Sequence, residues 1–401
     1  MKVKTLLILM TFVAVVSDTM LHPFYPQFFS QQFGIDTPEH TGYYLAGCCL
    51  TIMIAFPFWA WVHKKYQLFD ILMITQLLAG ILCCSIYWVQ SIEFFWMLAL
   101  SMIFFKGSYL LMYPFIMKID KEENHTSSIS ILSVIVHFGA ILGAFFGGSM
   151  LDWFEVKYVF FIMAMGDFVQ LFVCFYLKRN PTTVEEKEVS EDTSEKLSTV
   201  QKWIKPHVLK VGGLTMILYF STFLIRPFFV EYWESVSKYD SNILGGLMYS
   251  IPAFVGVIAL IYNHTKGKNQ QVYKLILPSI ILGICGIALQ GSGYVLSIVF
   301  GRILYGWAVF QIYVQFDVIA FKSSQPEEYA SDYSKIHFLQ NLGVLFSSLV
   351  SGFIVDHFSL EMPFGIAIAG FVIAAAIYMW AFKKEIISKN NQNKAAMPAA
   401  V

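Results

Sequence analysis

Two short stretches decide the fold of this 401-residue chain: HPFYPQFF at residues 22–29 and RPFFVEYW at residues 226–233. The second follows the first at an offset of 204 residues, from His22 to Arg226. The same offset relates Phe138-Gly139 and residues 148–152 to Leu342-Gly343 and residues 352–356, and nearly the same offset relates Lys178-Arg179 to Lys383-Lys384. Agreement in three separate places indicates two copies of one unit in the same orientation.

The composition places both copies in a membrane. Hydrophobic residues make up 57% of the chain and charged residues only 13%, against about 25% in a soluble domain. So little charge cannot cover a soluble surface of this size, which predicts a polytopic membrane protein. A formal net charge of zero argues against a nucleic-acid partner, which would require a basic face. The six cysteines all fall in apolar runs, so we expect packing roles and neither disulfides nor a metal site.

Twelve apolar runs are long enough to cross a bilayer, which takes about 20 residues per helix. The first run contains Asp18, lacks a small-residue cleavage site and is too long for a signal peptide, so it is predicted to be an uncleaved helix. The runs cover roughly residues 5–32, 42–62, 70–90, 93–117, 128–152, 156–178, 208–234, 242–263, 273–292, 294–320, 334–356 and 361–382.

Lysine and arginine set the orientation. With both termini in the cytoplasm, 22 of the 27 basic residues lie in cytoplasmic segments and 2 in outer loops, while Lys106, Arg226 and Arg302 lie within the membrane. This bias is typical of inner membranes and indicates a bacterial cytoplasmic membrane. The predicted organisation is an N-terminal six-helix bundle (1–180), a cytoplasmic linker (181–207), a C-terminal six-helix bundle (208–385) and a disordered cytoplasmic tail (386–401).

Two further motifs accompany the repeat: Gly139-x3-Gly143-x3-Gly147-Gly148 in span 5 and Arg302-x3-Gly306 in span 10. With the twelve spans and the long middle loop, they make the chain resemble the major facilitator superfamily over essentially its whole length. The chain departs from the family pattern in the loop at residues 59–66, which keeps only the basic residues, at Ile103 in place of an arginine, and at Ala144 in place of a proline often found in efflux members.

The resemblance implies an all-α membrane fold of two pseudo-symmetric six-helix bundles, twelve helices in total. It also implies a substrate site near the midplane, lined by spans 1, 4, 7 and 10, and transport by alternating access.

Ionisable side chains at membrane depth cost several kcal/mol unless they are paired or hydrated. Asp18 and His22 share one face of the first helix, just before Pro23. We expect Asp18 to couple transport to protons, assisted by His22 or by His137 in span 5. The alternative is a hydrogen bond that caps the proline kink. Asp167, in the peripheral sixth span, is expected to form a structural pair.

The three intramembrane cations are expected to face the central cavity, which favours an anionic or zwitterionic solute. Arg226 either binds an anionic group of the solute or joins the halves through an acid such as Asp18. Arg302 either faces the solute or holds loop carbonyls. The predicted substrate-binding residues are Lys106, Tyr109, Tyr113, Arg226, Arg302, Tyr305, Gln311, Gln315, Gln340 and Asn341, and the amides could equally join helices.

Other residues are predicted to act in gating or structure. The glycines of span 5 permit close helix approach, either as a hinge between states or as plain packing. Asp317 is expected to form a gate or helix-end contact, and Asp152 and Asp356 lie at the outer rim. The predicted gating or structural set is Gly139, Gly143, Gly147, Glu231 and Asp317.

The leading hypothesis is a monomeric, proton-coupled secondary transporter for a small polar solute, such as an organic acid, an amino-acid-like compound or a carboxylate siderophore. No phosphate-binding loop, metal-spaced cluster or nucleophile motif is present in the sequence, so neither an enzyme nor a cofactor is expected. One alternative is a proton-driven efflux pump for amphipathic compounds, given 38 Phe, 21 Tyr and 9 Trp. Another is a membrane sensor or enzyme on a transporter scaffold.

Overall fold

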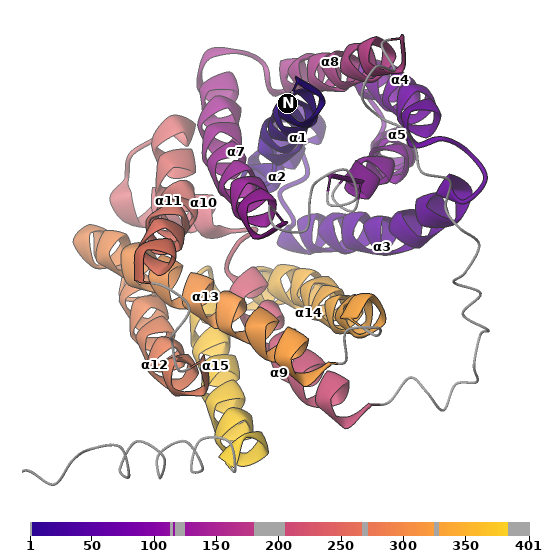
Figure 1. The fold of residues 1–401 in the computed structure, drawn as a ribbon. Helices are drawn as coiled ribbons and strands as arrows, with labels where there is room; N and C mark the ends of the chain where they lie inside the picture. The colour runs from indigo at the N-terminus through magenta and orange to yellow at the C-terminus, as the bar shows by residue number, and fades with distance from the viewer. Residues whose placement is uncertain are drawn as a thin grey trace, which may run out of the picture.

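The computed structural model describes residues 2–112, 115–116, 125–179, 205–266, 272–324 and 329–383, and all regular structure in these ranges is helical. Helices α1 to α8 gather in one group and α9 to α15 in a second (Figure 1). The predicted all-α, two-bundle fold is therefore confirmed. The helices are α1 (Lys2–Thr19), α2 (Tyr25–Phe33), α3 (Pro38–His63), α4 (Leu68–Ile86), α5 (Ile92–Lys106), η1 (Gly107–Leu111), α7 (His125–Trp153), η3 (Val156–Tyr158), α8 (Val159–Arg179), α9 (Pro206–Leu224), α10 (Phe229–Ser237), α11 (Asn242–Lys266), α12 (Val272–Gln290), α13 (Val295–Ser323), α14 (Tyr329–His357) and α15 (Met362–Ala381).

Eleven of these helical segments are long and apolar enough to cross a membrane. They coincide with eleven of the predicted runs. The remaining run, the first in the chain, is divided between α1 and α2. Eight of the twelve predicted spans therefore correspond to a single helix. The other four correspond to the pairs α1–α2, α5–η1, η3–α8 and α9–α10.

The repeated stretches are the places where the first and seventh spans break. Each break contains a proline, Pro23 or Pro227, which has no backbone N–H to continue a helix. The residues before α2 and α10 adopt nearly the same conformation, with φ of −121° at Phe24 and −110° at Phe228. Both short helices then end in the left-handed region, at Gly34 (φ 65°) and at Lys238 (φ 59°). The two copies thus share their local geometry as well as their sequence.

Close helix contacts repeat at the same offset. A methyl group placed on Gly166 of α8 would lie 2.0 Å from Ser17 Oγ, and one placed on Gly370 of α15 would lie 2.0 Å from Ser221 Oγ. In both halves a glycine therefore lets the sixth span approach the first span of its copy. This correspondence fixes which residues are equivalent between the halves.

The glycine run of α7 packs inside the first half. Methyl groups on Gly139, Gly143 and Gly147 would collide with residues of α1 and the segment after it: Val15, Thr19 and Met20. The run therefore serves close packing of α7 against α1, one of the two predicted readings, and its role as a hinge stays a prediction.

The halves meet along α7 beside α11 and α3 beside α14 (Figure 1). We call the side where α8 ends and α9 begins the linker side, and the opposite side the far side. Gly148 faces the backbone of Asn242, and Gly42 faces the backbone of Gly352. All four residues lie near the far-side ends of their helices, so the halves are in tight contact there.

The buried core follows the duplication. One cluster of buried apolar side chains runs from Val208 to Phe382, and two others are built almost entirely from residues 7–177. The predicted linker (181–207) and tail (386–401) lie almost wholly outside the described residues, so the proposed division at the linker remains a prediction.

Candidate functional site

Three charged residues meet inside the first half. Lys106 Nζ lies 2.7 Å from Asp18 Oδ1 and 2.7 Å from Asp167 Oδ1. The side chains come from α5, α1 and α8, and we call them the charge triad. Asp167 is fully buried, Lys106 is 8% exposed and Asp18 is 24% exposed. With both carboxylates ionised the charge triad carries a net charge of −1.

The fold does not require this cluster. At the offset of 204 residues, Asp18 corresponds to Thr222 and Asp167 to Phe371. The second half builds both positions from neutral residues that are fully buried. Since buried charge in a membrane is costly, the difference between the halves indicates that the charge triad serves a function.

The charge triad also changes two expectations about pairing. Lys106 was expected to face the solute, and the structure places it between two acids. Asp18 was one candidate partner for Arg226, and here its ion pair is with Lys106. Asp167 forms an ion pair, as expected, and its partner Lys106 also pairs with Asp18, the residue predicted to couple protons. Sequence alone could not connect α8 to this site, because no motif marks Asp167.

Arg226 lies at the start of the break between α9 and α10 and is half-buried. Its guanidinium lies 4.0 Å from the centroid of the Phe223 ring. Among the described residues it has no carboxylate within ion-pair distance. His22, its repeat partner, is exposed and lies within electrostatic range of both Asp18 and Arg226. His22 is thereby near both Asp18 of the charge triad and the arginine.

Tyrosines surround Arg226. Four of them interact electrostatically with its guanidinium: Tyr219, Tyr249, Tyr305 and Tyr313. The rings of Tyr219 and Tyr313 are stacked with their centroids 4.5 Å apart. The Tyr313 hydroxyl lies 2.6 Å from Thr222 Oγ1, and the Tyr305 hydroxyl donates to the Thr222 carbonyl at 3.3 Å. Of the four, only Tyr305 was predicted. The signal for Tyr219 was its place seven residues before Arg226, two helical turns away on the same face.

Arg302 has a different environment. It is 3% exposed, donates to the carbonyl of Met248 at 3.2 Å, and also donates to the carbonyl of Tyr249. Its guanidinium covers the Phe229 ring at 3.9 Å from the centroid. Arg302 therefore holds α13, α10 and α11 together. Backbone carbonyls were expected as partners in a loop, and those found lie within α11. The predicted role of Arg302 in substrate binding remains a prediction.

Of the predicted amide side chains, Gln311 and Asn341 form hydrogen bonds with described residues. Gln311 and Asn263 exchange two hydrogen bonds, at 3.1 and 3.0 Å. Asn341 Nδ2 donates to the carbonyl of His337 at 3.0 Å. Gln340 Oε1 is buried and has no hydrogen-bond partner within the described part of the chain, and Gln315 is 3% exposed. Substrate contact by these residues stays a prediction.

The remaining predicted residues are scattered. His137 of α7 faces Gly256 of α11, where the two halves meet, and Tyr109 is half-buried in η1. Asp317 of α13 is half-buried and forms no hydrogen bond or ion pair with a described residue. Tyr113 lies outside the described residues.

Glu231 lines a far-side cavity of about 210 Å³. Its wall comes from α2, α10 and the start of α3, and three of its residues, Asp36, Glu231 and Glu234, are acids. The cavity therefore lies on the far side, between residues of the two halves.

The sequence profile of the Major Facilitator Superfamily matches residues 7–292, well over half of the chain. The chain belongs to the major facilitator superfamily. It is a multi-pass membrane transporter of that superfamily, as the resemblance implied. No curated protein matches the chain in a sequence comparison.

Solved structures of transporters have a similar fold. The nucleoside transporter NupG superposes with a TM-score of 0.74 at 14% identity, covering 96% of this transporter and 100% of that chain. A bacterial homolog of the human lysosomal transporter Spinster, inward-facing and unoccupied, gives 0.71 at 14% identity, with 95% and 96% covered. The POT family transporter PepTSo gives 0.76 at 8% identity, with 96% and 98% covered. At such low identity these likenesses show the fold of the transporter alone.

Asp152 joins the two halves of the transporter at the far side. Its carboxylate accepts hydrogen bonds from the backbone N–H groups of Asn242 (2.9 Å) and Ile243 (3.0 Å) and from the Ser241 hydroxyl (3.1 Å). It therefore caps the first turn of α11 from the end of α7, across the boundary between the halves. A carboxylate at a helix N-terminus is also favoured by the helix dipole.

We predict that Asp152→Ala weakens far-side closure by about 1–2 kcal/mol, the usual value of an N-cap, and so enlarges the population with an open far side about 5- to 30-fold. Spin labels at Phe154→Cys and Tyr239→Cys, in a background lacking the native cysteines, would report a longer distance in the variant. Asp356→Ala is the control, because Asp356 makes no such bond to α3. An unchanged distance distribution in Asp152→Ala would contradict the capping role.

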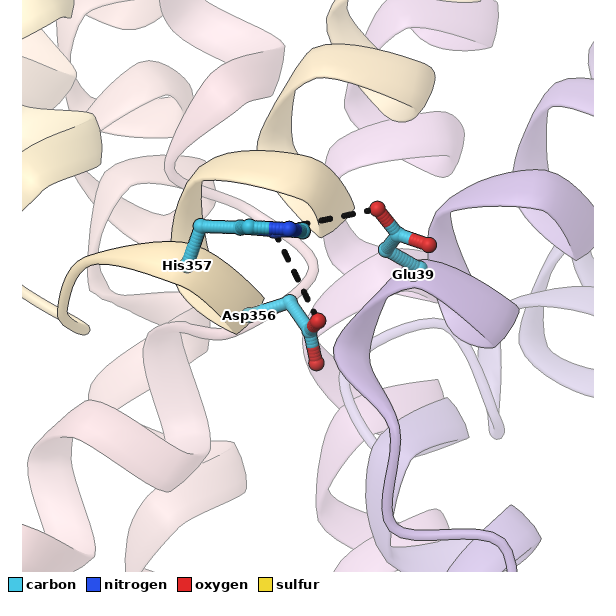
Figure 2. Close-up of side chains that lie close together, drawn as sticks. All are labelled: Glu39, Asp356 and His357. Atoms are coloured by element: carbon cyan, nitrogen blue, oxygen red, sulfur yellow. Dashed lines mark ion pairs between the residues drawn. The ribbon is translucent and has the colours of Figure 1, made fainter.

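Asp356, which corresponds to Asp152 at the offset of 204 residues, has different partners (Figure 2). Helix α3 begins with Pro38, which has no N–H to donate. Instead, His357 Nδ1 lies 3.6 Å from Asp356 and 3.8 Å from Glu39. These three side chains are the one grouping among the described residues with the spacing of metal ligands. His357 Nδ1 also lies 3.1 Å from the Phe353 carbonyl, which can only accept a hydrogen bond, so this nitrogen acts as a donor and only Nε2 could bind a metal.

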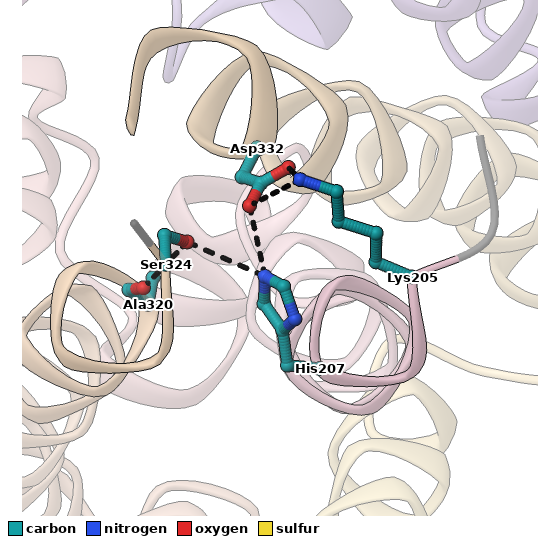
Figure 3. Close-up of polar contacts among 5 residues, drawn as sticks. All are labelled: Lys205, His207, Ala320, Ser324 and Asp332. Atoms are coloured by element: carbon teal, nitrogen blue, oxygen red, sulfur yellow. Dashed lines mark hydrogen bonds and ion pairs between the residues drawn. The ribbon is translucent and has the colours of Figure 1, made fainter. Parts of the chain in front are cut away.

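A second cluster fastens the linker side of the second half (Figure 3). Asp332, at the start of α14, is fully buried and lies 2.8 Å from His207 Nε2 and 3.2 Å from Lys205 Nζ. Ser324, after α13, lies 3.4 Å from the same nitrogen of His207. One carboxylate thus connects the beginning of α9, the beginning of α14 and the end of α13.

We predict that Asp332→Ala lowers the free energy of unfolding by about 1–3 kcal/mol, because a buried hydrogen-bonded charge is removed and its partners lose their acceptor. Thermal unfolding of the purified transporter in detergent measures the effect. Asp70→Ala, which removes an exposed ion pair with Lys178, should cost at most about 1 kcal/mol. Equal losses in the two variants would refute the role of Asp332.

Proposed function

We propose that this chain is a proton-coupled secondary transporter of a small polar solute that carries an anionic or strongly hydrogen-bond-accepting group. The observation that carries the proposal is the charge triad with its net charge of −1, beside His22 and an arginine that has no acid partner among the described residues. The charge triad can take up a proton, and Arg226 can donate hydrogen bonds to an acceptor group on the solute.

Proton coupling is assigned to Asp18. It is the more exposed acid of the charge triad, at 24% against 0% for Asp167, so a proton arriving from water would reach it first. Protonation would neutralise the net charge of the charge triad. His22 lies four residues further along the chain, in the break between α1 and α2, and its imidazole can relay a proton.

Solute recognition is assigned to Arg226 and its tyrosines. A guanidinium offers a planar set of donors to a carboxylate, phosphate or carbonyl group, and the stacked Tyr219 and Tyr313 offer a flat surface to a ring. Lys106 and Arg302 are engaged elsewhere, so the solute meets one cation. This favours a zwitterionic or neutral polar solute with a single strong acceptor over a multiply charged anion.

The solute class includes organic acids, amino-acid-like compounds and nucleosides. The structural likeness to a nucleoside transporter and the tyrosines around Arg226 make nucleosides the first solutes to test. Carboxylate siderophores, with several anionic groups, fit a site with one cation less well.

The second candidate is proton-driven efflux of amphipathic compounds. The observation in its favour is the aromatic surface formed by Phe223, Tyr219 and Tyr313. Under this candidate, binding of lipophilic compounds would be independent of the charge of Arg226.

Solute-triggered proton movement in proteoliposomes tests the proposal. Nucleosides, small carboxylates, amino acids and lipophilic cations would be added in turn, and a pH-sensitive dye inside the vesicles would be followed. The proposal expects a pH change for a polar solute that disappears in Asp18→Asn. A response to lipophilic compounds alone would favour the second candidate.

A further inference from the structure

The charge triad contains one more carboxylate than proton coupling through Asp18 needs. Asp167 is fully buried on α8, and its Oδ1 lies as close to Lys106 Nζ, at 2.7 Å, as Asp18 Oδ1 does. Lys106 therefore stands between an accessible acid and an inaccessible one. A fully buried acid that no solute can reach needs a role other than solute binding.

We propose that Asp167 is a positioning residue for proton coupling, which retains Lys106 as a charged partner while Asp18 holds the proton. This inference rests on the proposed function. The proton binds a carboxylate oxygen of Asp18, Asp18 becomes a neutral carboxylic acid, and the Lys106 ammonium keeps its ion pair with Asp167. The charge triad changes from −1 to 0, and no cation is left without a partner.

The physical reason is the cost of an unpaired ammonium in the membrane. Without Asp167, protonation of Asp18 would leave Lys106 buried with no anion, which is strongly unfavourable. The negative charge of Asp167 also repels the ionised form of Asp18. Both effects favour proton uptake, and both disappear when Asp167 is neutral.

No other described group can replace Asp167. The further titratable side chains within electrostatic range of Lys106 or Asp167 are Cys83 and Cys84 of α4 and Tyr25 of α2. Thiols and phenols are neutral at physiological pH. The two carboxylates are therefore the only anions near Lys106 in the described part of the chain.

The backbone holds Asp167 at this place. Its neighbour Gly166 packs against Ser17, the neighbour of Asp18, so closely that a methyl group would lie 2.0 Å from Ser17 Oγ. The same contact in the second half, Gly370 on Ser221, positions Phe371 and Thr222 instead. The duplicated fold supplies the close approach, and the first half alone uses it to bring two acids to one lysine.

The test measures uphill solute uptake by proteoliposomes as a function of external pH. Removal of a unit charge a few ångströms away should move the pH midpoint of uptake in Asp167→Asn to lower pH by about one unit or more. Asp167→Glu keeps the charge and should restore the midpoint. The matched control is Asp70→Asn, which removes a different ion pair between α4 and α8 and should leave the midpoint unchanged. A wild-type midpoint in Asp167→Asn would overturn the proposal.

Asp167→Asn leaves Lys106 with one acid, and a failure of this variant to fold would obscure the result. A second comparison avoids this problem. Lys106→Gln should move the midpoint to higher pH, and the double variant Lys106→Gln, Asp167→Asn should move it back by about one unit or more, with no unpaired lysine in either case. Equal midpoints in these two variants would also overturn the proposal.

Infrared difference spectra of the purified transporter locate the proton. The band of the protonated carboxyl group should disappear in Asp18→Asn and persist at lower pH in Asp167→Asn; loss of the band in Asp167→Asn alone would reverse the assignment. If wild-type protein moves no protons with any solute, the proposed function itself fails. If it does, and only the midpoint shift is missing, the failure concerns Asp167 alone.

Discussion

Asp18→Asn is expected to abolish gradient-driven accumulation of solute while solute exchange continues. For a neutral solute carried with one proton, a membrane potential of 100 mV supplies about 2.3 kcal/mol, which corresponds to about 50-fold accumulation. The variant should reduce this ratio to about 1. Exchange requires no net proton movement, and Lys106 keeps its ion pair with Asp167, so the folded transporter should survive the change.

Accumulation and exchange of radiolabelled solute in the same proteoliposomes separate the two effects. Asp70→Asn is the control, because this acid pairs with Lys178 outside the charge triad. Full accumulation by Asp18→Asn would rule out Asp18 as the coupling residue. Loss of exchange together with accumulation would show that Asp18 is needed for the movement of the protein itself.

Arg226→Gln is expected to weaken solute binding by about 10- to 100-fold, since a hydrogen bond to a charged group contributes about 1.5–3 kcal/mol. Stability should change little, because the removal of Arg226 leaves no described carboxylate without a partner. Arg226→Lys should restore only part of the affinity, because an ammonium lacks the planar donors of a guanidinium.

Arg302→Gln is the contrasting variant. Arg302 is buried and donates to two backbone carbonyls, so its loss should lower thermal stability before it affects affinity. Isothermal titration and thermal unfolding of the two variants, measured in one detergent, compare the effects directly. Equal effects on binding and stability in both variants would refute the distinction between a solute-binding and a structural arginine.

The sequence and the structure differ most in their treatment of the three intramembrane cations. In sequence, Lys106, Arg226 and Arg302 look alike, each a lone cation in an apolar span. In the structure one lies between two acids, one lies among tyrosines with no acid partner in the described part of the chain, and one holds backbone carbonyls. Which partner a long side chain reaches depends on the rotation and closeness of neighbouring helices, and neither can be read from a single span.

What the sequence determined by itself was local or repeated. Span length follows from hydropathy, because the bilayer sets the number of apolar residues in a helix. The break at residues 20–24 was expected from Pro23, which removes a backbone donor, although Pro57, Pro252 and Pro278 lie inside unbroken helices. The pseudo-symmetry follows from the offset of 204 residues, and the same offset reappears in the contacts of Gly166 and Gly370.

Only the tertiary structure decided the site. Asp18 and Lys106 are 88 residues apart in the chain, and Asp167 comes from a further helix with no motif of its own. Their contact depends on the packing of three helices, two of which, α1 and α8, approach closely where Gly166 lies against Ser17, an effect of packing and not of composition. Chemistry that depends on pairs of side chains from different spans is therefore decided by helix packing. The length and apolar character of the spans are decided by the lipid bilayer.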